Sequence, residues 1–227
     1  MNDAKGALPS TSTTVQQSSV ALLIIDMISD FEFEDGAEVY KNARKIVQSI
    51  ADLKSRARAA NVPVIYLNDN YGRWNEDFAS FVQNIKDNSR RGREIIEILE
   101  PQDDDLFVLK PQRSGFYGTS LGVLLLSMGV SNIILTGVTT DICILFTAHD
   151  AYMRGYNVQI PSDASASGNT RHHTSALNFL QRVADADIRK TEAIDFSVIA
   201  DKEILGAEPT MLSNFSDFID DLRLAVA

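Results

Sequence analysis

The sequence predicts an α/β fold in which a mostly parallel sheet of about six strands is covered by helices on both faces. Two patterns support this prediction. Short, continuous runs of aliphatic and β-branched residues, typical of buried strands, alternate with longer segments whose apolar residues recur every three or four positions, as in amphipathic helices. Repeated strand–helix order implies right-handed crossovers and therefore parallel strands. The length of 227 residues and the lack of a linker favour one large domain.

The first part of the chain predicts two strands, one helix and a long polar loop. Val20–Ile25 is an uninterrupted aliphatic run that stops at Asp26, as expected for a strand buried on both faces. Apolar residues at helical spacing predict a helix over residues 39–60, and the β-branched run 62–67 predicts the second strand. Residues 71–89 are polar with scattered aromatic side chains, and we expect a loop with one helical segment there.

The second part repeats the alternation of strands and helices. Strands are expected at residues 105–109, 132–136 and 156–160, and residues 188–190 are the candidate for a sixth strand. Helices are expected at residues 119–128, 141–154 and 171–185, the first two ending before glycines.

The expected domain covers residues 19–195. Residues 1–18 are rich in Ser, Thr, Gln and Gly and lack the apolar core of a secretory signal, so we expect a flexible N-terminal tail. Residues 196–227 carry apolar side chains at helical spacing, which predicts a C-terminal helical extension that packs on the domain or on a neighbouring subunit.

Composition narrows the classes of partner. A formal net charge of −10 repels phosphate backbones and anionic lipids, and no basic run extends beyond Arg90, Arg91 and Arg93. We therefore expect neither a nucleic acid nor a membrane as partner, and we expect a cytoplasmic protein because no apolar stretch reaches the ~20 residues of a membrane span. The single cysteine, Cys143, excludes an internal disulfide and a Cys-rich zinc module.

Three reactive side chains, Asp26, Lys110 and Cys143, stand at the carboxyl ends of expected strands, where open parallel sheets bind ligands. If those strands are adjacent, a carboxylate, an ammonium and a thiol converge, as covalent nucleophilic catalysis requires. Asp26 would take the thiol proton, while Lys110 and the N-terminus of the helix that holds Cys143 would lower the thiol pKa. Each residue alone has an ordinary structural explanation: Asp26 as a turn residue, Lys110 as a solvent-exposed lysine, and Cys143 as a buried core residue. The prediction therefore depends on their joint placement at the carboxyl ends of the strands.

Three motifs carry a resemblance to a known family. They are Leu-Ile-Ile-Asp-Met at 23–27, Leu-Lys-Pro at 109–111 with Ser-Gly-Phe-Tyr-Gly-Thr at 114–119, and Gly-Val-Thr-Thr-Asp-Ile-Cys-Ile at 137–144. Together they resemble the isochorismatase-like cysteine hydrolases, which include nicotinamidases, N-carbamoylsarcosine amidases, biuret hydrolases and isochorismatases. The resemblance runs from about Ser19 to Lys190 and implies a Rossmann-like three-layer α/β/α sandwich that forms a homodimer or homotetramer.

The resemblance also implies a mechanism without a cofactor. Asp26 would be the base, Lys110 the orienting cation and Cys143 the nucleophile of a catalytic triad that hydrolyses a C–N bond in a small amide or ureido substrate through a thioester. The Val138–Thr139 peptide bond would be cis, and the N–H groups of Thr139 and Cys143 would form an oxyanion hole.

A metal site is not expected. Nicotinamidases of this superfamily carry an Asp-x-His…His metal site, and the matching stretch here, Asp69-Asn70-Tyr71, has tyrosine where the first histidine would stand. The chain has three histidines, His149, His172 and His173. His172 and His173 lie near the start of an expected helix, and we expect them to cap or pack against this helix and not to bind a metal.

Polar and aromatic side chains near the expected site are candidates for substrate binding. Arg113 could bind a substrate carboxylate through its guanidinium fork, or form a surface salt bridge. Phe31 could close the pocket or pack in the core. The remaining candidates at the pocket mouth are Asn68, Asp69, Tyr71, Trp74, Phe116 and Tyr117.

Two other functions stay open at this point. One is hydrolysis of an isochorismate-like enol ether, against which Cys143 counts because that reaction does not rely on a cysteine nucleophile in this superfamily. The other is a catalytically silent scaffold or thiol redox sensor, against which the intact set of Asp26, Lys110 and Cys143 counts.

Overall fold

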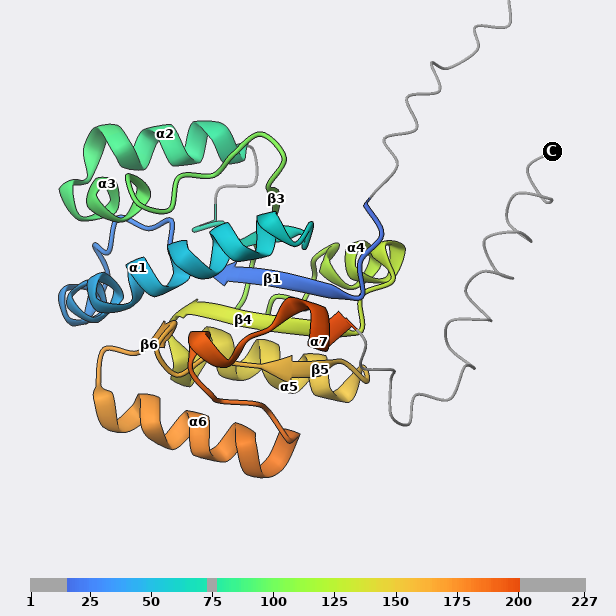
Figure 1. Cartoon of the computed structure of the whole chain (residues 1–227). Coiled ribbons are helices and arrows are strands. Elements are labelled where there is room, and N and C mark those ends of the chain that lie inside the picture. Colours follow the sequence, from blue (N-terminus) through green and yellow to red (C-terminus); the bar gives the residue numbers. More distant parts are fainter. Residues whose placement is uncertain (1–15, 73–76, 201–227) are drawn as a thin grey trace, which may run out of the picture.

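The computed structural model describes residues 16–72 and 77–200. Its centre is a six-stranded sheet in the order β3-β2-β1-β4-β5, with β6 paired to the end of β4 and every pairing parallel (Figure 1). The predicted α/β class and mostly parallel sheet are confirmed. The strands are β1 (Val20–Ile25), β2 (Val64–Asp69), β3 (Leu106–Lys110), β4 (Asn132–Val138), β5 (Asn157–Gln159) and β6 (Ser165–Ala166).

Helices cover both faces of this sheet. The α-helices are α1 (Gly36–Ala59), α2 (Phe78–Asn88), α3 (Arg90–Ile96), α4 (Leu121–Met128), α5 (Leu145–Met153), α6 (Thr170–Ala184) and α7 (Phe196–Ala200). A π-helical turn, η1 (Thr140–Ile144), precedes α5, and a 3-10 turn, η2 (Thr191–Ala193), precedes α7.

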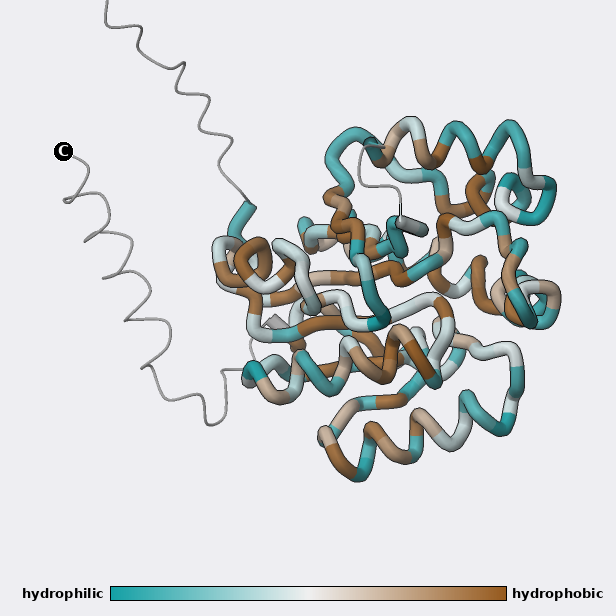
Figure 2. Tube along the Cα trace, turned by 180° about the vertical axis from the view of Figure 1, so that it is seen from behind, coloured by the Kyte–Doolittle hydropathy of each residue, from teal (hydrophilic) through white to brown (hydrophobic). Residues whose placement is uncertain are grey.

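The alternation of side chains along β1 divides the interior into two cores. Val20, Leu22 and Ile24 pack with α1, α2, α3 and α7, whereas Ala21 and Leu23 face α4, α5 and α6 on the other side of the sheet. All six residues of β1 are fully buried, which explains the continuous aliphatic run in the sequence. Hydrophilic and hydrophobic residues alternate along the outer helices (Figure 2). This pattern is expected for helices that pack one face on a sheet and expose the other to solvent.

The polar segment 71–89 agrees with the prediction of a loop with one helical segment, because it holds α2, whereas the helix α3 directly after it was not predicted. Asp77 begins α2 by accepting a hydrogen bond from the Ser80 N–H, and Ser89 begins α3 by accepting one from the Gly92 N–H. These caps satisfy N–H groups that the first turn of a helix leaves free. The aromatic side chains of α2 bury themselves in the first core.

The position of the sixth strand was also predicted wrongly. It is β6, which pairs Ser165 and Ala166 with the end of β4, and not residues 188–190. Near that segment only an isolated bridge joins Asp187 to β5. The chain then turns away, because the Asp163 carboxylate binds both the N–H and the hydroxyl of Thr191.

The two predicted terminal segments lie mostly outside the described residues. Residues 1–15 of the expected tail and residues 201–227 of the expected extension are not described. The start of the extension is α7, which places Phe196 and Ile199 in the first core, so at least this part packs on the domain. Within the described ranges, no helix combines the length and apolarity that crossing a bilayer would take.

Candidate active site

The three residues singled out from the sequence meet at the carboxyl edge of the sheet. Asp26 follows β1, Cys143 lies in η1 directly after β4, and Lys110 is the last residue of β3. The strands β1 and β4 are neighbours, but β2 separates β3 from β1. The expected adjacency of all three strands is therefore not needed, because the long side chain of Lys110, fully buried, spans the end of β2.

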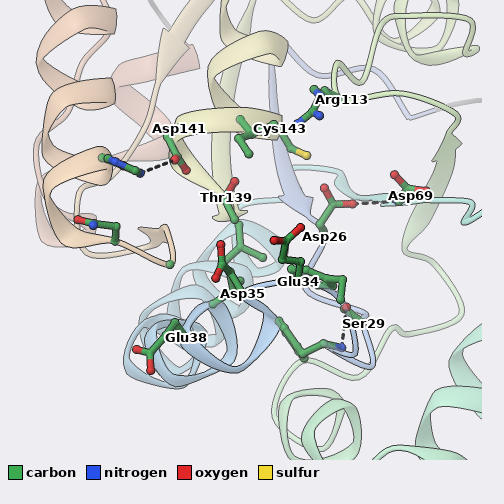
Figure 3. Close-up of a pocket in the computed structure, with 18 of the residues that line it drawn as sticks. Asp26, Ser29, Glu34, Asp35, Glu38, Asp69, Arg113, Thr139, Asp141 and Cys143 are labelled. Atoms are coloured by element: carbon green, nitrogen blue, oxygen red, sulfur yellow. Dashed lines mark hydrogen bonds and ion pairs between the residues drawn. The ribbon is translucent and has the colours of Figure 1, made fainter.

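Lys110 connects the carboxylate to the thiol. Its Nζ lies 2.9 Å from Asp26 Oδ2 and 3.6 Å from Cys143 Sγ, and it lies 3.8 Å from Asp69 Oδ2. The other oxygen of Asp26 accepts a hydrogen bond of 2.8 Å from the Asp69 N–H (Figure 3). Burial alone would lower the pKa of Lys110, but the neighbouring Asp26 carboxylate, with which it forms the ion pair, outweighs burial, so that the pKa is raised above its usual range. Lys110 is therefore a cation in the folded protein.

The thiol of Cys143 differs from the expectation of a lowered pKa. Burial raises the pKa of Cys143, and the charge of Asp26 raises it further, whereas Lys110 lowers it. The lowering effect of Lys110 that we expected is present, but burial and the Asp26 carboxylate are stronger, so the thiol keeps its proton in the resting protein.

The connection from β4 into η1 brings the nucleophile to the edge that holds Asp26. Gly137 has φ 106°, and a Cβ at this position would lie 2.1 Å from the Ile25 carbonyl oxygen, so the backbones of β4 and β1 approach too closely for any side chain. The next peptide bond, Val138–Thr139, is cis. The Thr139 carbonyl then accepts two hydrogen bonds of 3.2 Å, from the N–H groups of Ile142 and Ile144 in η1.

A cavity of about 580 Å³ opens in front of these residues. This volume is within the range of sites that bind small molecules. Cys143, Thr139 and Asp26 line it, and the first turn of α1 forms the opposite wall (Figure 3). The remaining lining residues are Ser29, Phe31, Phe33, Glu34, Asp35, Glu38, Val39, Asp69, Tyr71, Arg113, Val138, Asp141, Ile142, Gly168, Asn169 and His172.

The structure places the sequence-predicted binding residues in different surroundings. Phe31, Tyr71, Arg113 and Asp69 line the cavity, and Phe31 belongs to the first hydrophobic core as well. Asn68, Phe116 and Tyr117 do not line it, and Trp74 lies outside the described residues.

Asn68 and Tyr117 were wrong as lining residues for opposite reasons. Asn68 is fully buried, and its amide donates a hydrogen bond of 2.7 Å to the Ile28 carbonyl. It therefore holds the loop after β1 in place from the protein interior. Tyr117 is 64% exposed and faces solvent. Phe116 is buried against Tyr156 in the second core.

The sequence analysis missed the acidic wall of the cavity. Glu34, Asp35 and Glu38 lie at the start of α1, and Asp141 lies in η1. The dense acidic run at residues 30–38, shortly after the first strand, was a visible signal that we had not used. Its position after β1 places it at the same edge of the sheet as Asp26.

The residues at the position of the nicotinamidase metal site do not fit a metal ion. The hydroxyl of Tyr71 lies 3.0 Å from Ser29 Oγ, and a phenol held in this way is a poor substitute for a histidine ligand. In the described ranges, no group of three or more His, Cys, Asp and Glu residues is arranged to hold a metal ion. His172 lies 3.5 Å from Asp141 Oδ2 and His173 lies 2.9 Å from Thr140 Oγ1, so both contact η1.

Known proteins share the sequence pattern and the fold of this chain. The model of the isochorismatase domain matches residues 20–191. The chain is 42% identical over 180 residues to the uncharacterised isochorismatase family protein YaaI of Bacillus subtilis, a match that covers 79% of this chain and 98% of YaaI. It is 33% identical over 147 residues to a streptothricin hydrolase of Streptomyces noursei, covering 65% of this chain and 54% of that protein.

Solved structures give the same result. The N-carbamoylsarcosine amidase of Thermoplasma acidophilum has a TM-score of 0.61 and 27% sequence identity, and the match covers 78% of this chain and 99% of the amidase. The family model covers the segment that contains Asp26, Lys110 and Cys143, from the start of β1 to the first residue of η2. The resemblance seen in the sequence motifs is confirmed, as is the prediction of a hydrolase, and the chain belongs to the isochorismatase family.

Proposed function

We propose that the protein is a cysteine hydrolase that cleaves a C–N bond of a small amide or ureido substrate through a thioester intermediate. The observation that carries the proposal is the position of Lys110, with its Nζ 2.9 Å from Asp26 Oδ2 and 3.6 Å from Cys143 Sγ beside the cavity. A base, a nucleophile and a cation that holds both are the groups that such a reaction uses.

In the first half of the reaction, Asp26 takes the proton of the Cys143 thiol as the sulfur attacks the substrate carbonyl. Because the resting thiol holds its proton, this transfer accompanies the attack, and Lys110 stabilises the sulfur as it becomes negative. The C–S bond forms and the carbonyl electron pair moves to oxygen, where the N–H groups of Thr139 and Cys143 would hold the oxyanion. As the C–N bond breaks, Asp26 gives the proton to the leaving nitrogen, which departs as ammonia or an amine.

In the second half, water replaces the leaving group. Asp26 takes a proton from the water molecule as its oxygen attacks the thioester carbon, and the C–S bond then breaks. The proton returns from Asp26 to the Cys143 sulfur, which restores the resting enzyme. Lys110 keeps Asp26 in place for both steps through the 2.9 Å ion pair.

Arg113 is the candidate for binding a negatively charged group of the substrate. It lines the cavity, and the described part of the chain gives its guanidinium no ion pair. A carboxylate could therefore bind both arms of its fork. From the family resemblance we further propose that the protein is cytoplasmic and forms a homodimer or homotetramer. Light scattering on the purified protein would test the oligomeric state.

The function is tested by ammonia release from a panel of small amides and ureas. The wild-type protein should hydrolyse at least one member, and Cys143→Ala should reduce that rate at least about 100-fold because the nucleophile is gone. A rate that survives in Cys143→Ala would refute the thioester mechanism. Hydrolysis of enol ethers by that variant would support the isochorismatase reaction instead, and a wild-type protein without turnover on any panel member would favour a scaffold.

A further inference from the structure

We propose that the substrate carries a positive charge on the part remote from the scissile carbonyl, and that Glu34, Asp35 and Glu38 recognise it. The inference rests on the proposed function, because it names the chemistry of the substrate that the same cavity would take. It is drawn from the charges that line the cavity.

The cavity is a ligand site on grounds independent of its acidic residues. Its inner end holds Cys143, the single thiol of the chain, together with Asp26 and the cis peptide at Thr139. Its volume of about 580 Å³ leaves room for a molecule larger than the amide or urea group that reacts. The rest of such a molecule must extend along the cavity walls.

Those walls are strongly acidic. Among the described residues, six carboxylates line the cavity, and the basic side chains that line it with them are those of Arg113 and His172. Four of the six lie near a basic side chain. Asp26 and Asp69 lie 2.9 Å and 3.8 Å from Lys110 Nζ, Asp141 lies 3.5 Å from His172, and Glu38 lies 3.5 Å from Lys41.

The negative charges of the acidic residues at the start of α1 are only weakly balanced by nearby positive charges. The side chains of Glu34 and Asp35 form neither a hydrogen bond nor an ion pair with another described residue. Glu38 lies 3.5 Å from Lys41, but both side chains are more than half exposed, so this pair contributes little. In Figure 3 Asp35 and Glu38 lie on the α1 side of the cavity, away from the sulfur of Cys143, and the carboxylate of Glu34 extends from that side toward Asp26.

Stabilisation of the α1 N-terminus explains these acidic residues only in part. A carboxylate in the first turn interacts favourably with the helix dipole, and Glu38 occupies such a position. Asp35, however, stands at the N-cap without capping the helix through its side chain, and its backbone is left-handed with φ 62°. Its carboxylate is therefore available to a ligand at the cavity wall.

The two ends of the cavity would then select a substrate of defined polarity. Arg113 lies near Cys143 and repels a cation there, whereas the carboxylates that extend from the α1 side, those of Glu34, Asp35 and Glu38, attract one (Figure 3). An ammonium or guanidinium group on the remote part of an amide would satisfy this arrangement. An amide with a negative group at the same place would be repelled.

Charged thiol reagents test the inference without a known substrate. The probes are the size-matched trimethylammonioethyl and sulfonatoethyl methanethiosulfonates, and uncharged methyl methanethiosulfonate. Because Cys143 is the single cysteine, intact-protein mass spectrometry reports its labelling directly. The ratio of the cationic to the anionic rate should exceed that of free 2-mercaptoethanol by at least about tenfold at low ionic strength, and should fall as salt is added.

A charge-matched pair of variants separates the cavity wall from the overall charge of the protein. The triple variant Glu34→Gln, Asp35→Asn, Glu38→Gln should lose most of the cation preference. The control variant Glu97→Gln, Asp103→Asn, Glu192→Gln changes the net charge equally at exposed positions that do not line the cavity, and should keep it. Asparagine tolerates the left-handed backbone at position 35, so the first variant is expected to fold.

The outcomes distinguish this inference from the proposed function. Labelling of Cys143 by all three probes without charge preference would overturn the acidic recognition wall and leave the cysteine hydrolase intact. Equal losses in the two triple variants would overturn it as well. If none of the probes labels Cys143 in the folded protein, although all label it after denaturation, the thiol is inaccessible and both proposals fail.

Discussion

Neutralising Asp26 should make Cys143 more reactive toward alkylation while abolishing turnover. Burial and the charge of Asp26 raise the pKa of the thiol, whereas Lys110 lowers it. In Asp26→Asn the raising influence of the carboxylate is removed and Lys110 stays next to the sulfur. The pKa of Cys143 therefore falls, and more thiolate is present at any pH below that pKa.

The size of this effect follows from the distances at Lys110. Its Nζ lies 2.9 Å from Asp26 Oδ2 and 3.6 Å from Cys143 Sγ, so the carboxylate and the sulfur are at most about 6.5 Å apart. Two unit charges at about 6.5 Å repel each other by roughly 2.5 kcal/mol at an effective dielectric constant of about 20. Because about 1.4 kcal/mol corresponds to a factor of ten and about 6.5 Å is the largest possible separation, the thiolate fraction should rise by at least roughly 60-fold.

The assay is the rate of alkylation by iodoacetamide from pH 5 to pH 10, followed by intact-protein mass spectrometry. Iodoacetamide is uncharged, so the charge of the cavity does not alter its local concentration. Glu97→Gln, a neutralisation outside the cavity, serves as control and should match the wild type. Ammonia release by Asp26→Asn should fall at least about 100-fold, because the group that carries the proton is missing. Alkylation that is unchanged or slower in Asp26→Asn would refute the electrostatic account of the thiol.

Two further substitutions test the geometry of the site. Lys110→Met removes the cation and leaves the Asp26 carboxylate beside the thiol, so alkylation of Cys143 should slow at least about tenfold. Turnover should fall as well. Faster alkylation would contradict the role given to Lys110. Gly137→Ala places a Cβ 2.1 Å from the Ile25 carbonyl oxygen at φ 106° and should lower the free energy of unfolding in urea by at least about 2 kcal/mol. Gly155→Ala, at φ 82° with no heavy atom within 4 Å of the added Cβ, is the matched control, and an equal loss there would contradict the close approach.

The sequence was sufficient to predict the sheet and the three residues at its carboxyl edge, because these features depend on local pattern. A fully buried strand needs a continuous aliphatic run, and Val20–Ile25 is one. Asp26, Lys110 and Cys143 follow such runs, so the topology brings them to one edge. What the pattern could not show is that β2 separates two of the strands and that the length of one lysine side chain spans the gap.

The features that were predicted wrongly depend on contacts distant in the sequence. The pairing of β6 with β4 is only two residues long, too short for a periodic signal. Whether Asn68 faces the cavity or the core is decided by the Ile28 carbonyl in another loop. The pKa of Cys143 depends on its burial, which the sequence motif around it does not reveal.

The most direct test of the central claim is to look for the acyl-enzyme on Cys143. An amide that the wild type hydrolyses is mixed with the protein, the reaction is quenched in acid within milliseconds, and the intact mass is measured beside the turnover rate of Cys143→Ala. The account predicts a mass increase equal to the acyl or carbamoyl group, located on the peptide that contains Cys143, together with a loss of turnover in the variant. Turnover in Cys143→Ala within about tenfold of the wild-type rate, with no acyl group on the wild-type protein, would contradict it.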